Sequence, residues 1–134
     1  MGRTFQLSQM PGIYAVCRLE SASSVPTWAT DALSQADFCS ITRTAEELSV
    51  VCRAELVPDA VEAARDWACF WLHGPFDFGE TGILVSLLNP LAEAGVGIFA
   101  ISTYDTDYIL VKQANAESAI RVWSEAGHTV DSPS

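Results

Sequence analysis

The 134-residue chain is long enough for one domain or for two very small domains that share a core. Hydrophobic residues make up 49% and charged residues 18% of the chain, which argues against a disordered protein and favours a packed core. Acidic residues outnumber basic residues 17 to 7, and Lys and Arg form no cluster. Because the resulting net charge of -10 repels a phosphate backbone, we do not expect a nucleic-acid partner.

Neither a membrane segment nor a cofactor or metal site is expected. The apolar stretches are broken well before the roughly 18 residues that a membrane span needs, and the starting segment MGRTFQLSQMPG lacks the apolar core of a signal peptide. The four cysteines form no CxxC pair and lie in apolar runs such as YAVCRL and LSVVCRA. We therefore interpret them as buried thiols of a protein in the reducing cytoplasm.

The first half of the chain predicts three strands and one short helix. The strands are predicted over residues 13–19, 38–42 and 48–52, the helix over residues 27–36, and a one-turn connection over residues 44–47. Thr44 and Glu47 have the spacing of a capping box in this connection. The Ala-rich stretch 58–64 is a plausible link between two halves of the protein.

The second half has a clearer pattern. Strands are predicted over residues 67–73, 97–103, 107–112 and 128–130, and helices over residues 83–94 and 116–126. Both faces of the strand 67–73 are apolar, which favours a central position in a sheet. Pro90 should kink the first of these helices, and Asn115 should cap the second. The order β-α-β-β-α-β is that of a ferredoxin-like fold, with helices on one face of an antiparallel sheet.

Two stretches of the second half carry a family resemblance. The segment DFGETGIL at the first strand-to-helix turn and the hairpin GIFAISTYDTDYILVK resemble an ACT domain, and in particular tandem ACT proteins related to cytosolic arginine sensors and to the regulatory part of aspartate kinase. The resemblance is weaker in the first half, where PGIYAVCRL and FCSITRTAEELSVVC carry it. It implies an α+β protein with two ferredoxin-like ACT domains, the first a degenerate copy over residues 1–60 and the second over residues 61–134.

The glycine-containing loop before the helix 83–94 is the best candidate for a binding site. Gly74, Gly79 and Gly82 fit neither a dinucleotide-binding nor a P-loop pattern, and Asp77 and Glu80 would repel a nucleotide. An amino acid fits better. Its carboxylate suits the free amides at the start of the helix, and its ammonium group suits Asp77.

In ACT domains generally, effectors bind at this turn and against the neighbouring hairpin. The resemblance therefore implies an amino-acid site whose loop is completed by STYDTD across a lobe or subunit boundary. The predicted ligand-binding residues are Asp77, Phe78, Thr81, Gly82, Ile83, Ser102, Thr103, Tyr104 and Asp107.

Several residues of the loop and the hairpin also have a purely structural interpretation. Asp77 can form an Asx turn with the loop backbone, and Thr81 can be the N-cap of the helix. Ser102 and Thr103 can be ordinary polar residues at a strand end, and Asp105 can be a turn residue. The acids Asp77, Glu80, Asp105 and Asp107 could instead hold Mg²⁺ or Ca²⁺, although no EF-hand spacing supports this.

No residue pattern indicates catalysis. The sequence has no Ser-His-Asp order, no metal triad and no lysine other than Lys112. Two functions remain: a small-molecule sensor, and a structural module that pairs sheet edges and binds no ligand. The expected partners are an amino-acid effector, a second copy of the chain in a homodimer or higher oligomer, and an enzyme that the protein regulates.

Overall fold

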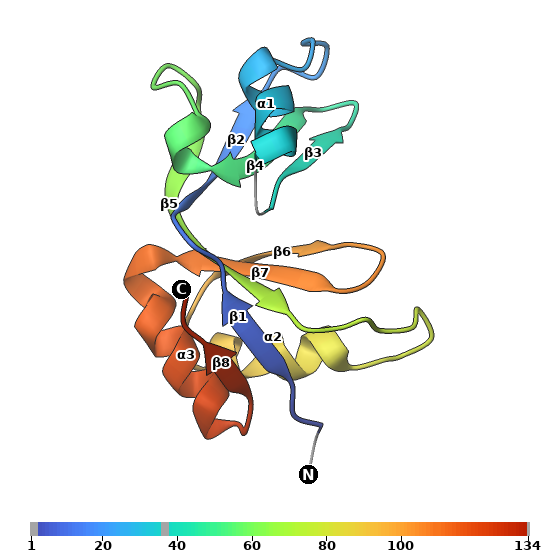
Figure 1. Cartoon of the computed structure of the whole chain (residues 1–134), viewed down its shortest axis with the longest axis vertical. Coiled ribbons are helices and arrows are strands. Elements are labelled where there is room, and N and C mark those ends of the chain that lie inside the picture. The colour runs from blue at the N-terminus through green and yellow to red at the C-terminus, as the bar shows by residue number, and fades with distance from the viewer. Residues whose placement is uncertain (1–2, 36–37, 134) are drawn as a thin grey trace. The chain divides into compact units, whose positions relative to one another are not determined.

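A computed structural model describes residues 3–35 and 38–133 of the chain (Figure 1). Its elements are β1 (Gln6–Gln9), β2 (Tyr14–Leu19), α1 (Thr27–Gln35), β3 (Ser40–Arg43), β4 (Leu48–Arg53), η1 (Ala54–Leu56), β5 (Ala63–Leu72), α2 (Ile83–Glu93), β6 (Ile98–Ser102), β7 (Asp107–Lys112), η2 (Gln113–Asn115), α3 (Ala116–Glu125) and β8 (Thr129–Asp131). Every predicted strand and helix is present, and most ends shift by one or two residues. Strand β5 is the exception, because it starts at Ala63, four residues early and inside the predicted link 58–64. The predicted last residue of the first helix, Ala36, lies outside the described residues.

The unit Gly12–Trp67 is a reduced ferredoxin-like copy. Strands β3, β4, β2 and the start of β5 pair in that order, and each pair is antiparallel. Helix α1 packs on this sheet through Ala29 and Ala32, which join a core cluster with residues of β2 and β4. Where a second helix would follow β4, the chain makes only the single turn η1. This copy is therefore degenerate because it lacks the second helix of a complete ferredoxin-like domain.

The turn between β3 and β4 is the predicted connection at residues 44–47. The Thr44 hydroxyl accepts hydrogen bonds from the amides of Glu46 and Glu47, both at 3.1 Å, and the Thr44 amide donates to the Glu47 carbonyl at 2.8 Å. The residue spacing of a capping box thus closes a tight turn here instead of starting a helix.

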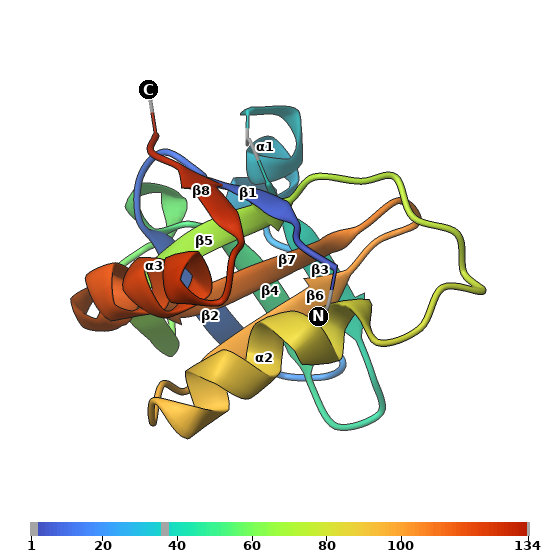
Figure 2. The ribbon, with the colours of Figure 1, turned by 90° about the horizontal axis from the view of Figure 1, so that it is seen from below.

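The second unit, Met1–Pro11 with Ala68–Ser134, contains the complete β-α-β-β-α-β order from β5 to β8. Alternate residues of β5 and β7, together with residues of α2 and α3, form one core cluster, so both helices cover the same face of the sheet (Figure 2). The members of this cluster with no exposed surface are Leu7, Ala68, Phe70, Leu72, Leu87, Leu91, Ile109, Val111, Ala119 and Trp123. The predicted α+β ferredoxin-like fold is confirmed.

Strand β1 was not predicted, and it changes the sheet of this unit. It lies between β5 and β8, antiparallel to β5 and parallel to β8, with Leu7 opposite both Leu72 and Val130. Residues Met1–Pro11 therefore group with the C-terminal unit instead of with the first copy, to which the sequence assigned them. The segment QLSQ has only one buried residue, so its local pattern gives little sign of a strand.

The ring of His128 connects three segments of the C-terminal unit. Its Nδ1 accepts a hydrogen bond from the Phe5 amide at 3.0 Å, which places the proton of the neutral ring on Nε2. The ring also lies close enough to the Ser86 backbone in α2 for that backbone to raise its pKa, against the larger effect of burial. Pro90 has no amide hydrogen and therefore leaves the Ser86 carbonyl of the same helix without its usual helical donor.

The glycine and asparagine predicted at helix ends have different roles. Gly95 follows Ala94, the C-cap of α2, and adopts a φ of 78°, as expected for a glycine that ends a helix. Asn115 precedes α3 by position, but its side chain makes no capping hydrogen bond. No helix among the described residues combines the length and apolar composition that crossing a bilayer requires.

The core of the C-terminal unit should be sensitive to single truncations on the inner side of α2. Leu87 has no exposed surface, so Leu87→Ala should lower the free energy of unfolding by about 2–5 kcal/mol. Val85, on the same helix, is 57% exposed, and Val85→Ala should change the free energy of unfolding by less than about 0.5 kcal/mol. Urea denaturation of both variants tests this. Equal losses of stability would contradict the finding that α2 turns Leu87, and not Val85, toward the core.

The buried position of His128 should make stability depend on pH. Burial lowers the pKa of this ring from 6.5, and the nearby Ser86 backbone only partly opposes the shift. The unfolded chain therefore takes up a proton near pH 6.5 that the folded protein does not. The free energy of unfolding should be at its full value above pH 6.5 and fall below it, by at most about 1.4 kcal/mol per pH unit.

Urea denaturation between about pH 7.5 and about pH 5.5 measures this slope. In His128→Asn the slope over this range should be much smaller, because the group that titrates is gone. A slope as steep in the variant as in the parent would assign the pH dependence to other residues.

Candidate functional site

A hollow of about 350 Å³ opens between the loop that precedes α2 and the β6–β7 hairpin. It is lined by Phe76, Asp77, Phe78, Glu80, Gly82, Ile83, Leu84, Val85, Ser102, Thr103, Tyr104, Asp105, Thr106 and Asp107. All of these residues belong to the C-terminal unit. The loop and the hairpin therefore meet within one unit, and no boundary between lobes or subunits has to bring them together.

The start of α2 presents unused backbone amides to this hollow. Gly82 is the N-cap and adopts a φ of 77°, a left-handed conformation that favours glycine. The first helical bond runs from the Ser86 amide to the Gly82 carbonyl. Among the described residues, none accepts a hydrogen bond from the amides of Gly82, Ile83 or Leu84, and no acidic side chain lies in the first turn. This helix start has the properties of an anion site.

Thr81 is not the N-cap and does not line the hollow. Its side chain is exposed, and Gly82 occupies the capping position without any side-chain bond. The alternative role of Thr81 as a helix cap is therefore wrong.

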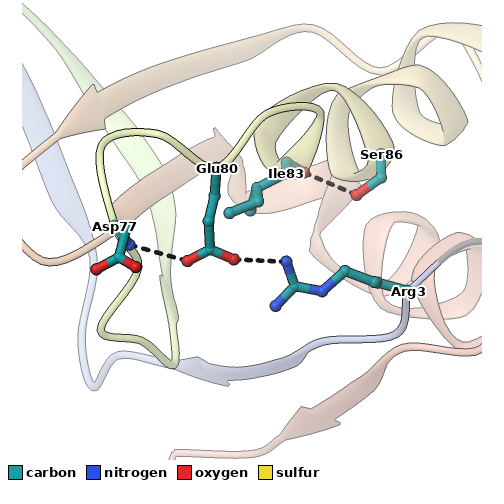
Figure 3. A network of polar contacts seen from close by, with 5 residues as sticks. All are labelled: Arg3, Asp77, Glu80, Ile83 and Ser86. Atoms are coloured by element: carbon teal, nitrogen blue, oxygen red, sulfur yellow. Dashed lines mark hydrogen bonds and ion pairs between the residues drawn. The ribbon is translucent and has the colours of Figure 1, made fainter.

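Glu80 holds the loop closed. One carboxylate oxygen accepts the Asp77 amide at 2.8 Å, and the Glu80 amide donates to the Asp77 carbonyl at 3.0 Å. The other oxygen accepts the Arg3 guanidinium at 2.6 Å (Figure 3). The hydrogen bond from Arg3 is the main cause that lowers the pKa of Glu80, and the bond from the Asp77 amide lowers it further. The Asp77 carboxylate has no bonding partner among the described residues, so the alternative of an Asx turn at Asp77 does not hold.

The hairpin provides the opposite side of the hollow. The Ser102 hydroxyl donates to the Asp107 carboxylate across the β6–β7 pair. In the turn, the Thr103 amide donates to the Thr106 carbonyl at 2.8 Å, and the buried Thr106 hydroxyl donates to the Leu72 carbonyl at 2.5 Å. The turn is thus anchored to the end of β5. Asp105 is a turn residue, and its carbonyl accepts the Phe76 amide of the facing loop at 2.8 Å.

Two aromatic rings meet at the mouth of the hollow. Phe78 from the loop and Tyr104 from the hairpin lie edge to face, with ring centroids 5.0 Å apart. Their side chains are 78% and 80% exposed, the highest values among the large hydrophobic residues that are exposed. Such rings have no packing role in the core and are available to contact a bound molecule.

Eight of the nine predicted site residues line this hollow, and Thr81 is the exception. Sequence reasoning missed Phe76 and the structural role of Glu80, which it treated as a charge that repels a nucleotide and as an alternative metal ligand. The Asp77–Glu80 spacing resembles the three-residue separation of a capping box, which could have indicated that role. No local sequence pattern could have linked Arg3 to Glu80, because the two residues lie 77 positions apart in the chain.

The described residues contain no group of three His, Cys, Asp or Glu side chains that could hold a metal ion. The alternative Mg²⁺ or Ca²⁺ site at Asp77, Glu80, Asp105 and Asp107 is therefore not formed. The four cysteines are free thiols, and burial raises the pKa of Cys17 to about 11 and those of Cys52 and Cys69 to about 12. Thiols with such pKa values are poor nucleophiles and metal ligands.

One hydroxyl–imidazole contact was not foreseen. The Ser8 hydroxyl lies 2.7 Å from His73 Nε2, and the imidazole stacks on Trp71 with centroids 4.2 Å apart. Neither Ser8 nor His73 lines the hollow. The contact joins β1 to the end of β5, where the His73 amide also donates to the Gln6 carbonyl at 2.9 Å.

Comparison with known proteins places the hollow within a family. The family model described as ACT domain matches residues 62–125, and a second model, of an N-terminal domain, matches residues 12–60. No curated protein matches the chain. A crystal structure of an Agobacterium tumefaciens protein is 37% identical, with a TM-score of 0.89 over 98% of this chain and 95% of that one.

Two further solved structures are more distant. The ligand-free regulatory subunit of aspartate kinase from Thermus thermophilus is 12% identical, with a TM-score of 0.60 over 86% of this chain and 93% of that one. Aspartate kinase from Clostridium acetobutylicum is 14% identical, with a TM-score of 0.63 over 90% of this chain and 34% of that one. At these identities the likeness shows a shared fold.

The left-handed conformation of Gly82 gives a test of the loop that needs no ligand. A methyl group at Gly82 would meet no atom within 4 Å, so Gly82→Ala should be destabilising only through its φ, by about 1–2 kcal/mol. Gly79 has equally open space without a left-handed φ, and Gly79→Ala should change stability by less than about 0.5 kcal/mol. If urea denaturation finds the two variants equally stable, Gly82 does not adopt this conformation in solution.

Proposed function

Because the chain belongs to the ACT domain family, we propose that it is a regulatory protein that binds a small molecule, and that this molecule is an α-amino acid. One observation carries the proposal. A single hollow contains free amides at a helix start and a carboxylate, Asp77, that has no partner among the described residues. These are the two groups that recognise the two charges of an amino acid.

The proposed pose follows from these charges. The ligand carboxylate accepts hydrogen bonds from the amides of Gly82 and Ile83, where the positive end of the helix dipole adds to the attraction. The ligand ammonium group donates to Asp77 in a charge-assisted hydrogen bond. The ligand side chain then points toward Ser102 and Asp107 of the hairpin, under the rings of Phe78 and Tyr104.

The charge of the lining supports a zwitterion over an anion. Four acidic residues line the hollow, and no Lys, Arg or His does. A phosphate or a dicarboxylate would meet net repulsion there, whereas an amino acid provides a positive group for Asp77. A volume of about 350 Å³ lies at the small end of the range for ligand pockets, which suits a molecule of this size.

The same lining supports a regulatory role over a catalytic one. No His, Cys or Lys lines the hollow, so it has no imidazole, thiol or amine that could act as a nucleophile or pair with one of its carboxylates in acid–base catalysis. A signal would then pass to a regulated enzyme or through a change in a homo-oligomer. The buried free thiols support a reducing compartment such as the cytoplasm.

A second candidate is a pairing module that binds no ligand. Strand β6 pairs only with β7 among the described strands, so its other edge is open to another strand. Size measurement at several protein concentrations, with and without amino acids, would reveal such pairing.

A thermal-shift screen against the common amino acids tests the proposal, and calorimetry with the strongest hit measures affinity. Asp77→Ala removes a charge-assisted hydrogen bond of about 1.5–3 kcal/mol, so affinity should fall roughly 10- to 100-fold. Glu125→Ala, which removes an exposed acid of α3 outside the hollow, is the matched control and should bind as the parent does. If no amino acid shifts the parent at about 1 mM, the pairing module becomes the better description.

A further inference from the structure

The loop of the proposed site is held from outside the hollow by the N-terminal segment. We propose that residues Arg3 to Gln9 form a latch on this loop, and that Arg3 is a positioning residue that fixes Glu80 and thereby the conformation of Asp77. The effect of the latch on ligand binding rests on the proposed function, whereas the latch itself can be detected without any ligand.

Glu80 is the residue through which Arg3 acts. Its two carboxylate oxygens are both engaged, one by the Arg3 guanidinium at 2.6 Å and the other by the Asp77 amide at 2.8 Å (Figure 3). The carboxylate therefore bridges a residue at the start of the chain and the backbone of the residue proposed to bind the ligand ammonium. Because the backbone of Asp77 fixes its Cα–Cβ bond, the position of Glu80 sets where the Asp77 side chain starts and thereby limits the positions that its carboxylate can reach.

Arg3 makes more contacts than a typical exposed ion pair. Its guanidinium lies over the Phe5 ring, 5.0 Å from the centroid, and 5.9 Å from the centroid of Phe76. The two rings contact each other edge to face at 5.8 Å. Phe5 belongs to the N-terminal segment and Phe76 lines the hollow, so Arg3 contacts both sides of the latch. Stacking on two rings restricts the guanidinium to the direction of Glu80.

The N-terminal segment has a rigid base from which Arg3 can act. The Phe5 amide donates to the buried His128 ring at 3.0 Å, and the Phe5 carbonyl accepts the Thr129 amide at 2.9 Å. From Gln6 onward the segment is β1, which is paired on both sides. Arg3 is thus two residues from a fixed point, which lowers the entropy cost of holding Glu80.

The alternative is an ordinary surface ion pair that leaves the loop unaffected. Hydrogen exchange at the Asp77 amide distinguishes the two, because this amide bonds to Glu80 and not to Arg3. In Arg3→Ala, its exchange should accelerate by about two- to fivefold, the range expected for loss of an exposed ion pair. Arg121 is an exposed arginine of α3 that forms no hydrogen bond or ion pair with another described residue, so Arg121→Ala makes the same change in net charge and should leave the exchange unchanged.

A spectroscopic signature of Glu80 provides the second measurement. The hydrogen bond from Arg3 is the largest cause that lowers the pKa of this carboxyl group. Its titration, followed by carbon NMR of the carboxyl, should move up toward the ordinary value in Arg3→Ala and stay in place in Arg121→Ala. Arg3→Lys retains the charge and should restore part of both effects. Parent-like exchange at Asp77 together with a parent-like titration in Arg3→Ala would overturn the latch.

Calorimetry with glycine connects the latch to binding, since glycine has the ammonium and carboxylate groups and no side chain. Its affinity for Arg3→Ala should be about two- to fivefold weaker than for the parent. Equal affinity, with faster exchange at Asp77, would show that Arg3 does not position the site. If no amino acid binds the parent while Asp77 exchange still depends on Arg3, the latch stands and the proposed function fails.

Discussion

The C-terminal unit depends on the insertion of β1 between β5 and β8. Without this strand, β5 and β8 would have no partner along these edges, and Leu7 would be absent from the centre of the core cluster. The same insertion brings Phe5 to His128 and Arg3 to the loop before α2. A strand of four residues thus determines both how the sheet closes and how the candidate site is held.

The hydrogen-bonding needs of nearby buried groups explain why His128 is tolerated in the interior next to β1. Pro90 in the interior of α2 removes one helical donor, and the Phe5 amide would otherwise be buried without an acceptor. A neutral imidazole has one donor and one acceptor, and His128 uses its acceptor for the Phe5 amide. The segment before β1 and the turn before β8 are therefore joined by one side chain, and the charged form of His128 would lose the bond from Phe5.

The candidate site combines this rigid base with a loop that has few apolar anchors. Ile83 and Phe76 connect the loop to the core cluster, whereas Phe78 is mostly exposed. The loop is otherwise closed mainly by the hydrogen bonds of the Glu80 carboxylate to the Asp77 amide and to Arg3. Regions with few buried apolar contacts lie at the low-stability end of a protein, where ligand-dependent changes are least costly. Such a loop suits a protein whose output depends on whether the hollow is occupied.

The sequence by itself determined the elements and residues that follow from local periodicity. The apolar stripe of α2, the two apolar faces of β5 and the β6–β7 hairpin were readable in this way, as was a loop with Asp77 and Gly82 at a helix start. Only the tertiary structure decided the place of β1, the partner of Glu80 and the bond from the Phe5 amide to His128. Each of these joins residues that are far apart in the chain. Segments such as QLSQ are ordered by strands on both sides and not by their own residues, so their role is decided only when the distant strands meet.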